Sequence, residues 1–353
     1  MVEIIETAAS FPDHYYQQEE ITEFLLDMWP EENKNLARLE EFHEHALVKG
    51  RYLSCALEDY LHLDDFEERN DIWIETALSL GEAATNQLLE KAGMAAEEVS
   101  VLAVVSTTGL AVPPIDARLM NRIPFSKELK RMPFFGFGCL GGVAGIARVA
   151  DYLEGHPGEA GILLSIEPCS LTVQRDDLSI ANVIASGLFG DGAAAVLLAG
   201  SDHPLSTVGK PRVIGTRSIQ FEDTERVMGW DISSSGFKIV LSPEIPDLAE
   251  NGFPPYVREF LSEYDLEARD IRYWIAHPGG PRVIEGIQKG LDLPQEAMAL
   301  SWESLRSVGN LSSASVLLVL DETLQRYQPE PGAYGLMMAL GPGFSAELIL
   351  LQW

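Results

Sequence analysis

Cys139 is the residue of this sequence best suited to act as a nucleophile. It follows an apolar, glycine-rich segment at residues 135–138 and precedes a run, residues 143–153, with the apolar spacing of a helix. The pattern predicts a strand, a sharp turn, the cysteine and then the helix. Because the N-terminal end of a helix carries a partial positive charge, we expect it to favour the Cys139 thiolate. Such a thiolate can carry an acyl group as a thioester.

Two other polar residues have side chains that can act together with this thiol. His277 follows an apolar run and precedes a rigid Pro-Gly-Gly-Pro turn, so its imidazole should face a cleft. Asn310 lies shortly before a helical pattern at residues 315–324. An imidazole can pair with a thiolate, and an imidazole and an amide can both donate hydrogen bonds to a thioester enolate oxygen. Each residue alone also has a structural explanation: a small buried cysteine, a loop histidine and a helix N-cap.

The chain contains a weak internal repeat. The spacing that separates Gly109 from Gly280, each just after an apolar segment, also separates Cys139 from Asn310. A helical pattern follows each of the last two residues, and a Pro-Gly turn before a strand pattern occurs in both halves. The repeat predicts a duplicated α/β unit with its related segments around a pseudo-twofold axis. The helix ends that bear Cys139 and Asn310 should therefore converge near that axis.

Hydrophobic periodicity predicts the elements that position these residues. A long amphipathic helix is expected over residues 72–92, and residues 15–70, rich in Glu, Asp and Leu, are also expected to be helical. Strand patterns lie at residues 101–105, 162–166 and 192–199. The loop-rich stretch 201–217 separates the two halves, which we place at residues 1–205 and 206–353.

The composition limits the class of protein. The chain has 353 residues, 46% of them hydrophobic, which is enough for a sizeable core. Its 54 acidic and 25 basic residues give a formal net charge of −29, which disfavours nucleic acid and anionic membranes as partners. The three cysteines form no C-x-x-C pair, no histidines have metal-ligand spacing, and no segment could span a bilayer. We therefore expect a soluble cytoplasmic protein without a metal, a cofactor or membrane insertion.

Segments around five positions resemble the bacterial type III polyketide synthases, relatives of the chalcone and stilbene synthases with the thiolase fold. They surround Cys139, Phe189, His277, Asn310 and residues 341–343, and the resemblance covers nearly the whole chain. It implies an α/β thiolase fold with duplicated αβαβα halves, a homodimer, and CoA or phosphopantetheine thioesters as substrates. It also implies that Cys139 carries the acyl group with His277 and Asn310 as its partners. Phe189 would lie between the CoA channel and the cavity.

The resemblance also indicates which residues meet the substrate. Val112 takes the place where plant relatives insert a methionine into the partner subunit's cavity. In long-chain alkylpyrone synthases, a small residue at the position of Cys169 opens an acyl tunnel, which favours a fatty starter, although a plain core cysteine fits equally well. The positions that line the cavity in relatives are Thr107, Thr108, Glu167, Cys169, Thr172, Gly341, Pro342 and Gly343.

The segment before Arg51 departs from the pattern of the family. Plant relatives carry several basic residues there that contact CoA phosphates, whereas residues 40–45 of this chain are mainly Glu and His. The remaining candidates for contacts with a CoA or carrier phosphate are Lys49, Arg51 and Arg282. Weak CoA contacts leave an acyl carrier protein as an alternative source of the acyl chain.

The predicted function is that of an iterative condensing enzyme. It loads an acyl group on Cys139, extends it by decarboxylative Claisen condensation with malonyl units, and cyclises the product to an α-pyrone or a phenol. One alternative is a ketosynthase that joins two carrier-bound chains into an α-pyrone, and another is an enzyme like 3-ketoacyl-ACP synthase III. A Cys-His-Asn peptidase, a dinucleotide-binding oxidoreductase with a G-x-G-x-x-G segment at residues 136–141, and a non-catalytic scaffold fit less of the sequence.

Overall fold

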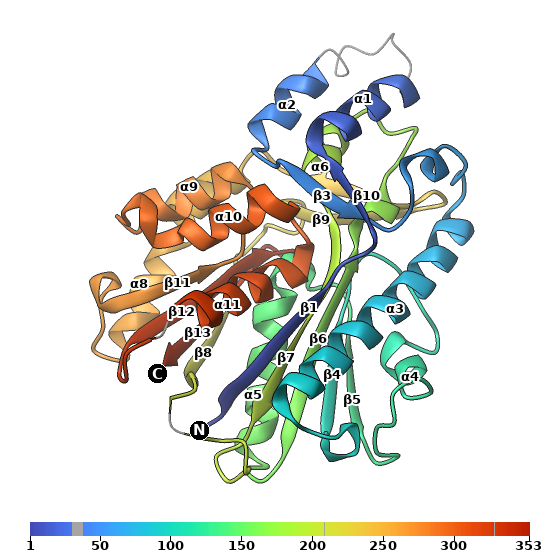
Figure 1. The fold of residues 1–353 in the computed structure, drawn as a ribbon. Coiled ribbons are helices and arrows are strands. Elements are labelled where there is room, and N and C mark those ends of the chain that lie inside the picture. The colour runs from blue at the N-terminus through green and yellow to red at the C-terminus, as the bar shows by residue number, and fades with distance from the viewer. Residues whose placement is uncertain (30–37, 208, 328) are drawn as a thin grey trace.

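The centre of the computed structural model, which describes residues 1–29, 38–207, 209–327 and 329–353, is a mixed β-sheet (Figure 1). Within these ranges the sheet has nine strands in the order β11-β12-β13-β8-β1-β7-β6-β4-β5. The strands are β1 (Glu3–Ser10), β4 (Val101–Val105), β5 (Lys130–Phe134), β6 (Ala160–Pro168), β7 (Asp191–Ala199), β8 (Arg212–Gln220), β11 (Ile271–Ala276), β12 (Tyr334–Gly341) and β13 (Ser345–Gln352). The expected strands at residues 101–105, 162–166 and 192–199 are therefore confirmed.

The sheet consists of two half-sheets that share the same four-stranded topology, to which the N-terminal half adds β5. In the N-terminal half-sheet, β4 pairs parallel with β6, β6 antiparallel with β7, and β7 antiparallel with β1. In the C-terminal half-sheet, β11 pairs parallel with β12, β12 antiparallel with β13, and β13 antiparallel with β8. The half-sheets meet where β1 pairs with β8 at Glu3 and Arg212. This repetition confirms the predicted duplicated α/β fold.

Helices lie between the half-sheets and on their outer faces. The central pair is α5 (Gly141–Glu154) and α11 (Ser315–Arg326), while α3 (Phe66–Ala92) covers the N-terminal half-sheet. The outer face of the C-terminal half-sheet packs against α8 (Pro254–Ser262) and α9 (Pro281–Gly290). Because successive side chains of a strand point to opposite faces, the apolar residues of β4 are divided between the central helices and α3. The result is five layers, αβαβα.

Small residues allow the N-terminal ends of the central helices to approach closely. A Cβ atom on Gly142 would lie 2.3 Å from the main-chain oxygen of Ser313, in the one-turn helix η9 (Ser312–Ala314) that precedes α11. A Cβ atom on Gly145, one turn further along α5, would lie 2.4 Å from the Leu163 side chain on β6. The backbone of α5 therefore packs directly against its neighbours at the end that follows Cys139.

An N-terminal subdomain contains strands as well as the expected helices. Helices α1 (Gln18–Met28) and α2 (Leu39–His45) lie beside an antiparallel pair of strands, β2 (His14–Gln17) and β3 (Gly50–Leu53). The expectation that residues 15–70 are helical is therefore wrong in part. The tyrosines of β2 and β3 favour strands, and this aromatic signal was outweighed by the acidic, leucine-rich composition around it. Residues 30–37 of that segment lie outside the described residues.

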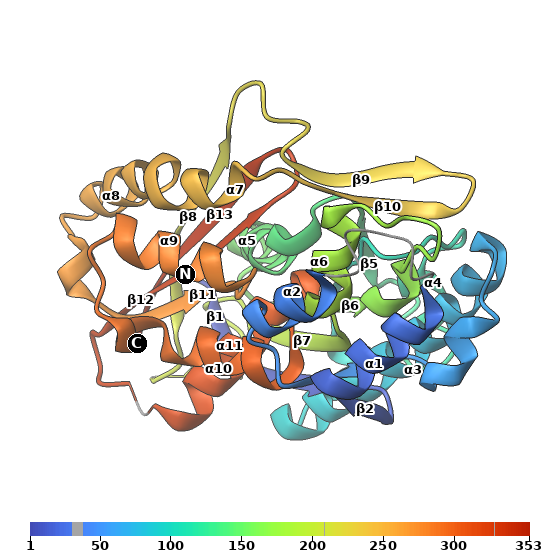
Figure 2. The same ribbon diagram turned by 90° about the horizontal axis from the view of Figure 1, so that it is seen from above.

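A long hairpin extends from the C-terminal half toward the N-terminal half. Its strands, β9 (Met228–Ser233) and β10 (Gly236–Leu241), form a separate sheet that contacts α6 (Ile180–Leu188), and Figure 2 shows them lying over that helix. The preceding segment differs from its prediction, because β8 begins at Arg212 and the end of the expected loop stretch 201–217 is strand. The hairpin thus brings residues of the C-terminal half over the other half.

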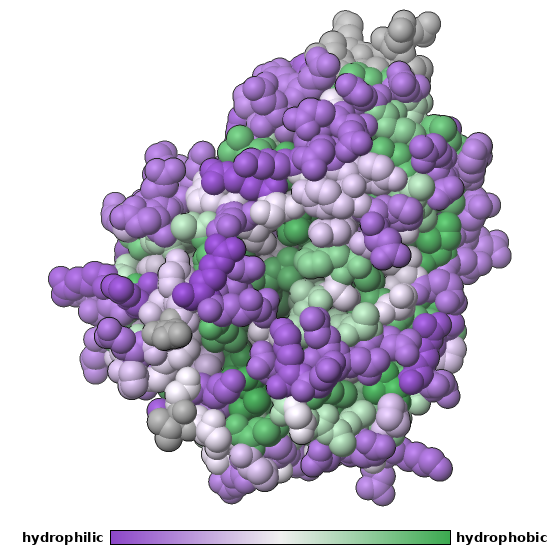
Figure 3. Space-filling model, in the orientation of Figure 1, coloured by the Kyte–Doolittle hydropathy of each residue, from purple (hydrophilic) through white to green (hydrophobic). Residues whose placement is uncertain are grey.

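Polar residues dominate the face of the molecule drawn in Figure 3, with apolar residues gathered toward its middle.

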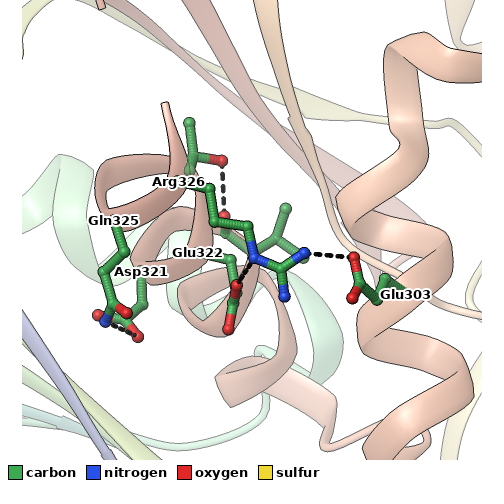
Figure 4. A network of polar contacts seen from close by, with 7 residues as sticks. Glu303, Asp321, Glu322, Gln325 and Arg326 are labelled. Atoms are coloured by element: carbon green, nitrogen blue, oxygen red, sulfur yellow. Dashed lines mark hydrogen bonds and ion pairs between the residues drawn. The ribbon is translucent and has the colours of Figure 1, made fainter. Parts of the chain in front are cut away.

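A network of polar contacts lies at the C-terminal end of α11 (Figure 4). Arg326 donates to Glu303 of α10 (Ala299–Val308) at 2.6 Å and also pairs with Glu322. Gln325 donates to Asp321 at 2.8 Å. A cation there also interacts favourably with the helix dipole. In the described part of the chain, no helix combines the length and the apolarity that a membrane crossing requires.

The close contact between α5 and η9 predicts that Gly142→Ala destabilises the protein. The added Cβ atom meets a main-chain oxygen, which cannot move aside without shifting η9, so we expect a loss of about 1–3 kcal/mol in the free energy of unfolding. Denaturant unfolding measures this change. Gly158→Ala is the matched control, because a Cβ atom there would have no neighbour within 4 Å. Equal stability of the two variants would contradict the prediction.

Candidate active site

A cavity of about 650 Å³ contains Cys139, His277 and Asn310 in its wall. Each residue stands at the end of an element. Cys139 lies in the one-turn helix η4 (Gly138–Leu140) at the start of α5, His277 follows β11, and Asn310 lies between α10 and η9. Cys139 and Asn310 precede equivalent helices of the two halves, α5 and α11. His277 follows β11, which is the counterpart of β4 in the C-terminal half-sheet. The duplicated fold thus brings together three side chains that are far apart in the sequence.

A tight turn directs Cys139 into the cavity. Gly138 has a φ angle of +52°, which glycine adopts most easily, and a Cβ atom there would lie 2.6 Å from the Pro342 ring. Cys139 itself is only 8% exposed. Burial, and then the charge of Glu167, raise the pKa of the Cys139 thiol to about 12, although hydrogen bonds from Ser312 and Asn310 oppose the rise. Burial therefore opposes the thiolate that the helix end was expected to favour.

His277 is held by its backbone and leaves its ring free. Its main-chain N–H donates to the carbonyl of Met338 on β12 at 2.9 Å. The side chain is 4% exposed, and neither ring nitrogen has a hydrogen-bond partner among the described residues. Burial lowers the pKa of the imidazole to about 3. Burial therefore opposes ionisation of either Cys139 or His277 alone, and a charged form requires transfer of a proton from the thiol to the imidazole.

Hydrogen bonds fix the orientation of the Asn310 amide. Its Oδ1 accepts from the main-chain N–H of Ser312 at 2.8 Å, which identifies the other end of the amide as the donor group. Nδ2 donates to the carbonyl of Gly279, in the turn after His277, at 3.2 Å. An amide NH₂ group has two hydrogens, and Asn310 also contributes a hydrogen bond to Cys139. Asn310 thus connects the loop of His277 with the thiol.

The cavity adjoins a smaller apolar space. Thr107, Thr108, Phe189, Cys169 and Pro342 line the main cavity, as the resemblance implied. Phe189 and Cys169 also line a neighbouring cavity of about 70 Å³, whose wall includes Thr172 and side chains from α1. Trp230 and Ile239, on the β9–β10 hairpin, border both spaces. No sequence pattern indicated these two residues, because the fold alone brings the hairpin over the cavity.

Glu167 lies behind the cavity wall rather than in it. Its carboxylate accepts hydrogen bonds from the Thr108 hydroxyl at 2.9 Å and from both the main-chain N–H and the hydroxyl of Thr107, at 3.1 and 3.2 Å. The hydroxyl groups of Ser106 and Ser313 donate to it as well. Burial raises the pKa of Glu167 while these donors lower it. The carboxylate therefore organises the threonines that the substrate would meet.

Three further predicted residues do not line this cavity. Gly341 and Gly343 flank Pro342. Of these three neighbouring described residues, Pro342 alone lines the cavity wall. Val112 is 94% exposed on the surface of its own chain.

Two of the predicted phosphate contacts lie away from the cavity. Arg282 is exposed and lines the cavity, but Lys49 is exposed outside its lining. Arg51 is only 1% exposed, and its guanidinium donates to main-chain carbonyls of α6, so its prediction as a phosphate contact is wrong. Arg38, which the sequence reasoning missed, lines the cavity and forms a 3.5 Å ion pair with Glu41. The sequence feature that could have identified Arg38 is a basic residue next to a mainly acidic segment.

Known proteins match this chain over nearly its full length. Residues 2–203 match the N-terminal domain of the chalcone and stilbene synthases, and residues 216–353 match their C-terminal domain. The chain is 44% identical over 344 residues to the 1,3,6,8-tetrahydroxynaphthalene synthase of Streptomyces peucetius subsp. caesius, which covers 98% of this chain and 91% of that protein. It is 31% identical over 281 residues to the 3,5-dihydroxyphenylacetyl-CoA synthase of Amycolatopsis balhimycina, with 79% of this chain and 74% of that protein covered.

The fold of this chain also matches the fold of a solved structure. The 1,3,6,8-tetrahydroxynaphthalene synthase of Streptomyces coelicolor A3(2), a bacterial type III polyketide synthase, superposes with a TM-score of 0.94 at 29% identity and covers 99% of both chains. The expected thiolase-like fold is thereby confirmed. Together with the two domain matches and the 44% identity, this agreement shows that the chain belongs to the chalcone and stilbene synthase family and is a type III polyketide synthase, an acyltransferase that condenses acyl units.

Proposed function

We propose that Cys139 carries the growing acyl chain while His277 and Asn310 hold the enolate that extends it. The observation that supports this assignment is that the three side chains share one buried cavity. A sulfur nucleophile, a ring nitrogen with no other partner and a fixed amide donor are the groups that thioester condensation requires. The proposal extends to CoA thioesters as substrates, with Arg38 and Arg282 positioned to meet their phosphates.

Loading begins when the Cys139 proton moves to His277 and the sulfur attacks the carbonyl carbon of an acyl-CoA. The tetrahedral intermediate collapses, the carbon–sulfur bond to CoA breaks, and the departing CoA thiolate takes the proton from His277. The acyl group is now bound to Cys139, and His277 is neutral again. In this form the imidazole is a hydrogen-bond donor rather than a base.

Extension begins with malonyl-CoA in the same cavity. Loss of carbon dioxide leaves an enolate whose oxygen accepts hydrogen bonds from His277 and from Nδ2 of Asn310. The enolate carbon attacks the acyl carbon on Cys139, a carbon–carbon bond forms, and the sulfur leaves as the thiolate. The apolar wall, to which Phe189 contributes, favours departure of the malonyl carboxylate as neutral carbon dioxide.

Two observations support different starters and products. The 44% identity to a 1,3,6,8-tetrahydroxynaphthalene synthase supports a product of phenolic type. The small apolar cavity beside Cys169 and Phe189 supports an alkyl starter, whose extension and lactone closure would give an α-pyrone. Both products arise from the same condensation and differ in how the finished chain cyclises. A chain delivered by a carrier protein stays the alternative to a CoA thioester.

We also propose a homodimer formed through the exposed side of β5. This strand is the end of the sheet order, and the nearby loops expose Val112, Leu110 and Phe135, with Val112 94% exposed. An unpaired strand edge beside apolar side chains is suited to pairing with a second copy of the chain. Sedimentation at micromolar concentration should give the mass of two chains, and the mass of one chain would exclude this arrangement.

We predict that Cys139→Ala abolishes acyl loading and product formation, because the other thiol of the cavity wall, Cys169, donates to the main-chain oxygen of Glu167 and burial raises its pKa. We predict that His277→Ala keeps the thiol but removes its proton acceptor. The Cys139 pKa, raised to about 12 by burial, then leaves little thiolate at neutral pH. Inactivation by iodoacetamide near pH 7 should be slower in His277→Ala than in the natural enzyme, and the pH at which it becomes fast should be higher in the variant. Identical pH profiles would remove His277 from this role.

The starter is tested with malonyl-CoA and a panel of acyl-CoAs of increasing length, with products identified by mass. If the small cavity holds the starter, Cys169→Phe should close the passage and reduce turnover of long acyl-CoAs about tenfold or more. Malonyl-CoA and short starters should be affected little. Cys55→Phe is the control, because Cys55 lines neither cavity. Turnover of malonyl-CoA alone, with no use of long starters, would instead favour the phenolic product.

A further inference from the structure

The segment that carries Phe189 is connected to the segment that carries Asn310 by main-chain hydrogen bonds. The N–H of Asn310 donates to the carbonyl of Leu188 at 2.8 Å, and the N–H of Gly190 donates to the carbonyl of Asn310 at 3.1 Å. Phe189 is the residue between Leu188 and Gly190. A shift of the main chain at one of these cavity residues therefore moves the other.

Arg51 is buried directly behind this bridge. Its Nη1 donates to the carbonyl of Gly187 at 2.8 Å, and its Nη2 donates to the carbonyl of Ser186. These carbonyls belong to the last turn of α6, where main-chain oxygens lack partners within the helix. A cation at a helix C-terminus is also favoured by the helix dipole. Arg51 thus caps α6 immediately before Phe189.

The aliphatic part of Arg51 contacts both connected segments. A Cβ atom on Gly190 would lie 3.0 Å from the Cβ atom of Arg51, and one on Gly309 would lie 3.6 Å from its Cδ atom. Gly190 follows Phe189, and Gly309 precedes Asn310. A side chain at Gly190 would crowd the arginine, whereas the distance at Gly309 is that of an ordinary van der Waals contact, so Arg51 packs beside both cavity segments.

Two neighbours hold the arginine in this position. The Gln18 side chain accepts from Nη1 at 2.5 Å and itself donates to the Gly187 carbonyl at 2.8 Å. The buried carboxylate of Asp191 supplies the opposing charge. Burial lowers the pKa of Arg51 to about 10, while Asp191 acts in the opposite direction, so the guanidinium stays charged at neutral pH. A fully buried charge that is placed in this way has a fixed geometry.

We propose that Arg51 is a positioning residue that sets the main chain of Phe189 and Asn310 together and thereby aligns the malonyl group with the enolate donors. This inference rests on the proposed function of the cavity. Arg51 acts through α6 and the Phe189–Asn310 bridge without touching the substrate. An error of about 1 Å in such a site can cost about 100-fold in rate.

The test compares Arg51→Met, which keeps a long side chain but no donors, with Arg51→Lys, which keeps the charge and part of the capping. The measured rate is carbon dioxide release from malonyl-CoA, divided by the number of Cys139 thiols that iodoacetamide titrates. We expect Arg51→Met to lower kcat per titrated thiol by about 10- to 100-fold, with KM changed less than about threefold. Arg51→Lys should recover part of the rate. Normal kcat per titrated thiol in Arg51→Met would overturn the proposal.

Arg69→Met is the matched control. Arg69 is 4% exposed and donates to the carbonyls of Leu63 and Ser235 at 2.8 and 2.6 Å, neither of which lines the cavity. We expect it to lower the melting temperature but leave kcat per titrated thiol within about twofold of the natural enzyme. Loss of rate equal to that of Arg51→Met would mean that any buried arginine has this effect, and it would also overturn the proposal. Gln18→Met, a milder change, should lower the rate in the same direction if Arg51→Met does not fold.

A second measurement is independent of activity. Hydrogen exchange of the Gly190 and Asn310 amides reports on the bridge itself. These amides should exchange about tenfold or more faster in Arg51→Met, while the amides of β4 keep their protection, and Arg69→Met should leave the bridge unchanged. If the natural enzyme releases no carbon dioxide, the proposed function is wrong, and faster exchange still supports the positional role of Arg51. Unchanged exchange at both amides would refute that role.

Discussion

The close contact between the N-terminal ends of α5 and α11 is the constraint on which the site depends. Gly142 packs against the main chain of Ser313, and no larger residue fits between them. Cys139 stands just before α5 and Asn310 just before η9, so the distance between these helix ends sets the distance between the sulfur and the amide. The two half-sheets pack on either side of the central helices and keep this contact buried.

Buried polar groups join the halves on either side of that contact. The Glu167 carboxylate, on β6 of the N-terminal half, accepts from Thr107 and Thr108 of the same half and from Ser313 of the C-terminal half. A buried carboxylate is costly unless its oxygens are hydrogen-bonded, so each lost donor would leave a penalty behind. The Ser165 hydroxyl of the N-terminal half also hydrogen-bonds to the Ser313 hydroxyl of the C-terminal half, at 2.6 Å. Such groups specify one arrangement of the halves where apolar contacts alone would tolerate small shifts.

Much of the architecture could be predicted from sequence because the signals were local or repeated. The strand patterns, the helix after Cys139 and the shared spacing of Cys139 and Asn310 all follow from period and composition. The mistakes arose where environment decides. Arg51 has the charge of a phosphate ligand, but β3 turns it beneath α6, and nothing local in the sequence reveals that direction. Trp230 reaches the cavity only because the β9–β10 hairpin crosses to the other half.

The environment also decides the electrostatics of Cys139, because burial opposes the expected effect of the helix end. A helix end stabilises a thiolate only by a modest amount, whereas removal of water from around the sulfur penalises the charge much more. The same penalty acts on His277, so burial opposes a charge on either group alone. In the proposed function, the same penalty acts on a malonyl carboxylate in the cavity and favours its departure as carbon dioxide. In the proposed mechanism one apolar wall therefore suppresses charge before the substrate arrives and favours decarboxylation afterwards. In the same proposal, the donors of His277 and Asn310 stabilise the charge that decarboxylation leaves on the enolate oxygen.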